Sequence, residues 1–229
     1  MKILGMDTSG STASVAVIDD TTLLGEYSIN HKKTHSQKLM PMLDELLRSL
    51  ALKPGDLDAF AISIGPGSFT GLRIGIATIK GIAHPLDKPV LSVPTLDGLA
   101  FNIAGYDGLI CPIIDARNDN VYTAIYKYNK DASTLSRKSE YMALHINDLL
   151  SQFKNDEKVM FLGDTNEKFK SIIQDKVNNS EFAPIHLALQ KASSIAFAGL
   201  EKFKAGQIDT YSGIKPLYVR PSQAERLCQ

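Results

Sequence analysis

Residues 3–18 read ILGMDTSGSTASVAVI, and this stretch decides the fold. An apolar run ends at Asp7, a turn rich in hydroxyl groups and glycine follows, and a second apolar run covers 14–18. Short apolar runs bounded by turn residues predict β-strands. A polar turn at 19–22 and a further run at 23–29 extend the pattern, so we predict a meander of three strands.

The same pattern returns at residues 109–128, LICPIIDARNDNVYTAIYKY. An apolar strand again ends in an aspartate, Asp115, and a polar turn leads into a β-rich return at 121–128. Two copies of one pattern indicate a duplicated unit. Apolar periodicity and turn residues place the remaining elements: helices at 36–52 (with Ser36 as N-cap), 70–83, 95–103, 145–153, 166–177 and 192–205, and strands at 59–64, 90–93 and 158–162.

A three-stranded meander followed by alternating helices and strands, used twice, is typical of the actin/Hsp70-like α/β fold (ASKHA, ribonuclease-H-like). We therefore predict two lobes of ordinary domain size, at 1–105 and 106–190, the second of them reduced. The C-terminal helix and tail, 191–229, are expected to return to the first lobe. In this fold, the loops after the first strand of each lobe face a nucleotide cleft.

Composition restricts the classes of function. The 229 residues hold 25 Lys and Arg against 25 Asp and Glu, so the formal net charge is zero. Proteins that bind nucleic acid alone usually carry a basic excess, and we expect any contact with RNA to be shared with a partner. Cys111 and Cys228 form no CxxC pair, and no apolar run approaches the ~20 residues of a membrane span. An aspartate at position 7 argues against a signal peptide, so a cytoplasmic protein is expected.

Two polar turns are candidates for the cleft. Asp7, Thr8 and Ser9 lie where a phosphate loop would offer backbone N–H groups to an anion, although tight turns use the same residues for their own geometry. We interpret them as a vestigial nucleotide loop. Asp115 and Arg117 occupy the equivalent turn of the second copy, either as a structural ion pair or as part of a shared binding site.

Residues 65–75, GPGSFTGLRIG, form the most distinctive segment. A turn between a strand and a helix suits phosphate binding, yet the segment lacks the GK[ST] end of a P-loop, the G-x-G-x-x-G pattern and the glycines of a nucleophile elbow. Helix-interior glycines such as Gly71 and Gly75 cost about 1 kcal/mol each relative to alanine. Close approach of another protein explains that cost, and packing on the chain's own sheet is the alternative.

The helix at 36–52 carries apolar residues beyond one narrow stripe, which indicates one face for the core and one for a partner. Together with the glycine-rich helix it gives the predicted partner-binding set: Leu39, Met40, Leu43, Leu47, Phe69, Thr70, Gly71, Arg73, Ile74, Gly75 and Thr78. His31 and His35 have the i, i+4 spacing of metal ligands. Lys32 replaces the glutamate of HExxH and no third ligand is evident, so solvated loop histidines are the favoured interpretation and no metal site is predicted.

Four segments resemble the bacterial TsaB (YeaZ) family: ILGMDTS at 3–9, SIGPGSFTGLRIG at 63–75, SVPTL at 92–96, and DAR at 115–117 followed by Val121 and Tyr122. The resemblance implies a dimerisation subunit of the machinery that makes N6-threonylcarbamoyladenosine in tRNA. Its implied partners are TsaD, which binds metal and nucleotide and performs the transfer, the small ATPase TsaE, and a second copy of itself. No cofactor is then expected on this subunit, and tRNA is contacted only through the complex.

The catalytic relative carries an H-x-x-x-H metal motif after its own Gly-Pro-Gly segment. Thr95 and Leu99 stand at the corresponding positions here, and a leucine cannot ligate a metal. The resemblance therefore predicts a subunit that is not an enzyme. Two alternatives remain: an actin-like ATPase that uses Asp7 and Asp115, and an inactive homologue of a glycoprotease-type peptidase.

Overall fold

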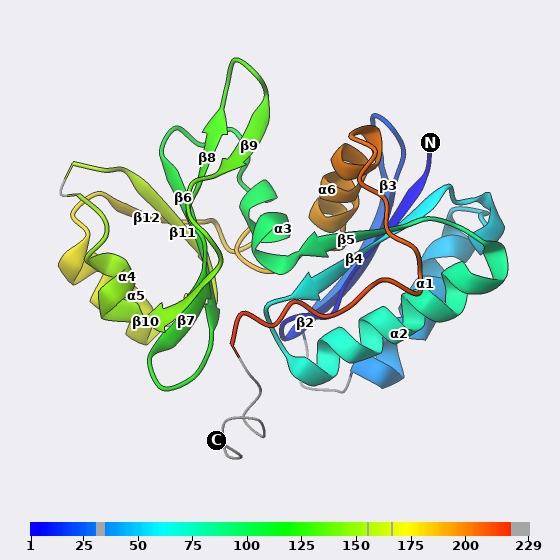
Figure 1. Ribbon diagram of the computed structural model, residues 1–229, viewed down its shortest axis with the longest axis horizontal. Helices are drawn as coiled ribbons and strands as arrows, with labels where there is room; N and C mark the ends of the chain where they lie inside the picture. Colours follow the sequence, from blue (N-terminus) through cyan, green and yellow to red (C-terminus); the bar gives the residue numbers. More distant parts are fainter. Residues whose placement is uncertain (31–34, 155, 166, 221–229) are drawn as a thin grey trace. The chain divides into compact units, whose positions relative to one another are not determined.

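The computed structural model describes residues 1–30, 35–154, 156–165 and 167–220 (Figure 1). The chain divides into two compact units. Met1–Gly98 and Gln190–Leu217 form unit 1, and Leu99–Leu189 with the described residues after Leu217 forms unit 2. The first segment of unit 1 thus ends at Gly98, whereas a boundary at 105 was predicted.

Unit 1 is built on a five-stranded sheet in the order β3-β2-β1-β4-β5. β1 pairs antiparallel with β2 and parallel with β4, which in turn runs parallel to β5. The predicted meander is therefore present. The strand bounds are β1 Ile3–Asp7, β2 Thr12–Ile18, β3 Leu23–Asn30, β4 Ala59–Gly65 and β5 Val90–Pro94.

Helices cover both faces of this sheet (Figure 1): α1 (His35–Ser49) and α2 (Phe69–Leu86) lie on one face, and α6 (Ala192–Lys204) lies on the other. Successive strand residues point to opposite faces, so Leu4 and Met6 join the core under α1 and α2. Gly5 faces α6, where an added Cβ would lie 2.2 Å from the carbonyl oxygen of Ala192. α6 therefore packs almost directly on the backbone of β1.

Several helix boundaries differ from the predictions, and two of the differences have a clear local cause or consequence. α1 begins at His35, so Ser36 lies inside its first turn and is not the N-cap. α2 continues through Pro85 to Leu86, whereas the prediction ended it before the proline. Pro85 sits in the last turn, where its missing N–H removes only one helical hydrogen bond. The short α3 spans Thr95–Phe101, and a 3₁₀ turn covers Pro54–Asp56.

Unit 2 contains a sheet in the order β10-β7-β6-β11-β12, with the β8–β9 hairpin attached to β6. The single strand predicted at 121–128 is in fact two strands, because β7 pairs with β10 while β8 pairs with β9. The bounds are β6 Leu109–Asp115, β7 Asn120–Thr123, β8 Tyr126–Asn129, β9 Thr134–Arg137, β10 Met142–His145, β11 Val159–Gly163 and β12 Ser180–Phe182. α4 (Ile146–Leu150) and α5 (Glu167–Lys176) supply the apolar core that this sheet needs.

The two units repeat one strand arrangement. β1 pairs antiparallel with β2 and parallel with β4; β6 pairs antiparallel with β7 and parallel with β11. Both first strands end at an aspartate, Asp7 or Asp115. The duplication predicted from the sequence pattern is confirmed.

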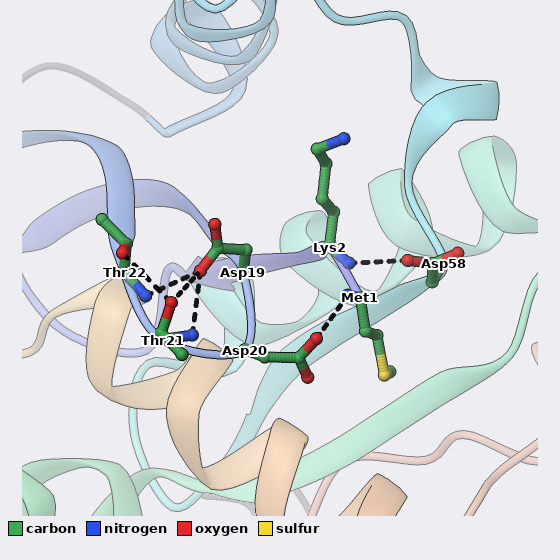
Figure 2. Close-up of polar contacts among 7 residues, drawn as sticks. All are labelled: Met1, Lys2, Asp19, Asp20, Thr21, Thr22 and Asp58. Atoms are coloured by element: carbon green, nitrogen blue, oxygen red, sulfur yellow. Dashed lines mark hydrogen bonds and ion pairs between the residues drawn. The ribbon is translucent and has the colours of Figure 1, made fainter.

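Polar contacts fasten the start of the chain to unit 1 (Figure 2). The α-amino group of Met1 lies 2.5 Å from Asp20, and the backbone N–H of Lys2 donates to Asp58 at 2.6 Å. Asp19 accepts the backbone N–H groups of Thr21 and Thr22, which closes the β2–β3 turn. Among the described residues, no helix has the length and apolar character needed to cross a bilayer.

Candidate functional site

Asp7 is buried at the end of β1, with 1% of its surface exposed. Its Oδ1 accepts the backbone N–H of Ser9 at 2.8 Å and the hydroxyl of Ser9 at 2.6 Å. Burial raises the pKa of Asp7 to about 6, although the hydrogen bonds from Ser9 favour the ionised form. The carboxyl group is therefore a structural anchor of the 7–10 turn and titrates in the mildly acidic range.

The turn after Asp7 is tied to the segment that opens α2. The hydroxyl of Thr8 donates to the carbonyl of Gly71 at 2.8 Å, and the backbone N–H of Ser68 donates to the carbonyl of Ser9 at 2.7 Å. A Cβ added to Gly71 would lie 2.0 Å from the Thr8 carbonyl oxygen. Because glycine has no side chain, the backbone of the turn after β1 can pack directly against α2 at this position. Internal packing, the alternative weighed from sequence, therefore accounts for Gly71 and Gly75, and their contacts give no support to the approach of another protein at these two positions.

Two further side chains cover the same turn. The Nε2 atom of His35, the first residue of α1, lies 2.9 Å from the carbonyl oxygen of Gly10. The amide of Gln190 lies against Gly10 and is 2% exposed. His35 is therefore engaged with the turn rather than solvated, contrary to prediction; its predicted companion His31 lies outside the described residues.

Asp115 of unit 2 repeats the contact made by Asp7. Its Oδ1 accepts the backbone N–H of Arg117 at 2.7 Å, two residues further along the chain. Within the described residues the ion pairs do not include one between these two side chains, so the structural ion pair weighed from sequence is absent. Arg117, Asn118 and Asp119 all have positive φ, at 66°, 53° and 60°.

Sequence reasoning missed Asp164, which lies beside this turn. Its Oδ2 accepts the backbone N–H of Asp115 at 3.0 Å. Burial raises the pKa of Asp164, and the negative charge of Asp115 raises it further. The sequence held a usable signal, because Asp164 follows an apolar strand as Asp7 and Asp115 do.

Thr95 and Leu99, at the positions that the resemblance compares with metal-binding histidines, are both buried. Thr95 is 0% exposed, and its hydroxyl lies 2.7 Å from the hydroxyl of Ser63. Leu99 is 1% exposed. Both side chains serve local packing. Within the described part of the chain, no group of three or more His, Cys, Asp and Glu residues is placed to hold a metal ion.

The residues of the predicted partner-binding set differ in how exposed they are to solvent. Five of its members face the interior of unit 1 and are unavailable to a partner in this conformation: Leu39, Leu43, Leu47, Gly71 and Gly75. Met40, which is 50% exposed, lies on the outer face of α1. Thr70 and Arg73 are exposed on α2, and Phe69, Ile74 and Thr78 are partly exposed. Ala77 and Gly81, outside the predicted set, are also exposed on α2.

These observations agree with comparisons to known proteins. The chain has the actin-like two-unit α/β fold, since it superimposes on a ROK hexokinase from Thermus thermophilus over 90% of this chain and 100% of the hexokinase, with a TM-score of 0.51 and 10% identity. YeaZ from Pseudomonas aeruginosa matches better, with a TM-score of 0.81 and 24% identity over 95% of this chain and 99% of YeaZ.

Sequence comparison narrows the class to one family. The model of the family TsaD, tRNA N6-adenosine threonylcarbamoyltransferase, matches residues 22–227. The tRNA threonylcarbamoyladenosine biosynthesis protein TsaB of Bacillus subtilis (strain 168) is 37% identical over 98% of this chain and 96% of its own length. The chain belongs to the TsaB (YeaZ) family.

Proposed function

We propose that this chain is a non-catalytic subunit in the biosynthesis of N6-threonylcarbamoyladenosine in tRNA, and that it works by pairing with TsaD. The pathway is supported by the name of the Bacillus subtilis relative and by the matching family model. The main observation that supports a non-catalytic role is the burial of Thr95 and Leu99, which are 0% and 1% exposed. A buried hydroxyl paired with Ser63 and a leucine offer no site for a catalytic metal.

The surface proposed for pairing is the outer side of α1 and α2, defined here as Met40, Thr70, Arg73, Ala77 and Gly81. The four α2 positions follow one another at helical spacing and form one stripe. A Cβ added at Gly81 would meet nothing within 4 Å, so no contact within the chain explains this glycine. The small residues Ala77 and Gly81 allow a second helix to approach closely at that end of the stripe, and we assign that second helix to TsaD.

No nucleotide or metal is assigned to this subunit. The donors of the turn are already engaged: the hydroxyl of Thr8 donates to Gly71, and the N–H and hydroxyl of Ser9 donate to Asp7. Buried polar groups that are already paired gain little from an incoming anion. ATP and metal are therefore expected on TsaD and TsaE, and the zero net charge leaves tRNA binding to the assembled complex.

The same surface is proposed to serve a homodimer, so that a second copy of the chain competes with TsaD for it. A role in tRNA modification also supports a cytoplasmic location, which is part of the proposal. The test is light scattering on size-exclusion fractions of the chain alone, with TsaD, and with TsaD and TsaE. A chain–TsaD heterodimer is expected, and elution of the two proteins as separate species at micromolar concentration would reject the proposal.

A further inference from the structure

Unit 2 contains a cavity of about 560 Å³ at the carboxyl ends of the parallel strands β6 and β11. Its size falls within the ~300–1,000 Å³ of ordinary small-molecule sites, and in α/β sheets ligands bind outside the carboxyl ends of parallel strands. The polar lining comes from Asp115, Asp164, Thr165 and Lys170, and the apolar lining includes Ile185 and Leu189. Asp115 was predicted from sequence to lie at a cleft, but neither the family assignment nor the proposed pairing surface names a ligand for this cavity.

The acidic end of the cavity is held by the backbone. The N–H of Asp164 donates to the carbonyl of Ile113 at 2.8 Å, while its carboxylate accepts the N–H of Asp115 at 3.0 Å. Gly163, with a φ of 93°, sets the direction in which the chain leaves β11. Asp115 and Asp164 therefore line the same end of the cavity, Asp164 is largely buried, and the negative charge of Asp115 acts on it. Like charges placed near one another in this way favour the binding of a cation.

Lys170 supplies one positive charge against these two acids, and it forms no ion pair with either of them among the described residues. Its ammonium group lies 3.9 Å from the carboxylate of Glu167 and 5.8 Å from the centre of the Phe182 ring. Its charge is thus already shared with an acid and an aromatic ring. Counting Asp115 and Asp164 against Lys170 leaves the cavity with a negative surplus, which repels phosphates and carboxylates.

The other end of the cavity is apolar and faces water. Ile185 is 95% exposed, and Leu189 is partly buried beside the cavity. A fully exposed isoleucine gains free energy when an apolar group covers it, at about 25 cal/mol per Å² of apolar surface removed from water. The cavity therefore combines an anionic end with a wall suited to hydrocarbon.

We infer that this cavity binds an organic amine: its ammonium group pairs with Asp115 and Asp164, and its carbon chain lies along Ile185 and Leu189. A nucleoside phosphate would add negative charge to a site that already has a surplus. A divalent metal is disfavoured because only two carboxylates converge, and the described residues contain no group of three or more potential ligands here. The inference does not depend on pairing with TsaD.

The test is titration calorimetry on the full chain with four probes: hexylamine, 1-hexanol, Mg²⁺ and AMP. Hexylamine should bind at least about tenfold more tightly than 1-hexanol, since the two differ by the charge that a carboxylate recognises. Binding of hexanol with equal affinity, tighter binding of AMP or Mg²⁺, or no binding of hexylamine would each overturn the inference.

Variants locate the site. Asp164→Asn keeps the shape and the acceptor for the Asp115 N–H, and should weaken hexylamine about tenfold or more, whereas Asp131→Asn, in the exposed β8–β9 turn, should leave the affinity unchanged. Ile185→Ser should weaken it about threefold without affecting folding, because the side chain is almost wholly exposed. Lys170→Met should bind hexylamine as well or better. Unchanged affinity in both Asp164→Asn and Ile185→Ser, or loss in Lys170→Met, would contradict the assignment.

Discussion

Gly75 of α2 lies directly against the hydroxyl of Thr8, so that a Cβ added to the glycine would stand 2.4 Å from Oγ1. The same Cβ would lie 3.1 Å from a methyl group of Ile62 on β4. This contact fixes how closely α2 approaches the turn after β1. It also means that a bulky replacement of Gly75 would test folding and not pairing.

Two glycines of one helix should therefore respond in opposite directions to the same change. Gly75→Ala inserts a methyl group into filled space, and we expect the free energy of unfolding to fall by about 1–3 kcal/mol. Gly81→Ala meets nothing within 4 Å and should raise it by about 0.5–1 kcal/mol through helix propensity. Urea unfolding of the two variants measures both changes. A lower free energy of unfolding in Gly81→Ala would contradict the open space found around Gly81.

The buried carboxyl of Asp7 should make stability depend on pH. Because burial raises its pKa in the folded state from 3.8 to about 6, the stabilising contribution of the neutral form is complete below about pH 3.8 and is lost as the pH rises through 6. Asp7→Asn is neutral at every pH and can still accept from Ser9. Its stability relative to the native chain should therefore increase from pH 4 to 6, by a gain on the order of 3 kcal/mol, and stay constant above.

Thermal melts of both proteins between pH 4 and 8 measure this difference. Charges elsewhere in the chain cancel in the comparison, since the two proteins share them. A difference that does not change with pH would mean that Asp7 keeps an ordinary carboxyl pKa.

Pairing with TsaD should depend on the exposed side of α2. Ala77→Arg and Gly81→Arg place a long charged side chain on that stripe, and each should weaken the heterodimer by at least about tenfold, because a desolvated unpaired charge is costly at an interface. Ala205→Arg, at the exposed end of α6, is the matched control and should pair normally. Surface plasmon resonance measures the dissociation constant of each variant for TsaD. Equal affinity of all three variants would show that the interface lies elsewhere.

The hydroxyl pair of Ser63 and Thr95 should be coupled. Both side chains are buried and lie 2.7 Å apart, so removing one hydroxyl leaves the other without its neighbour. We expect Thr95→Val and Ser63→Ala each to cost about 1–3 kcal/mol, and the double variant to cost less than the sum. Additive losses in urea unfolding would show that the two hydroxyls act independently.

The order of the first strands in both units could be predicted because the signal is local. Apolar runs that end in an aspartate mark β1 and β6, and turn residues separate each of them from the next strand. It could not predict β9, β10 and β12, which are three or four residues long and owe their existence to pairing with neighbouring strands. The same limit applies to the glycines. A cost in helix propensity is visible at Gly75 and Gly81 alike, but only the three-dimensional contacts reveal that one faces Thr8 and the other faces open space.

The apolar pattern of α1 also could not show which of its residues are buried. Leu39, Leu43 and Leu47 looked available because the apolar surface of α1 is broad, yet all three are buried in the core of unit 1. Asp164 went unnoticed because its significance lies in a hydrogen bond to Asp115, far away in the sequence.

The central claim, a subunit that enables transfer without performing it, is tested most directly by threonylcarbamoyl transfer to tRNA in a reconstituted system. We expect no product from the chain alone, and product with TsaD and TsaE that falls sharply when the chain is omitted or carries Gly81→Arg. Transfer by the chain alone, or full activity without it, would contradict the account.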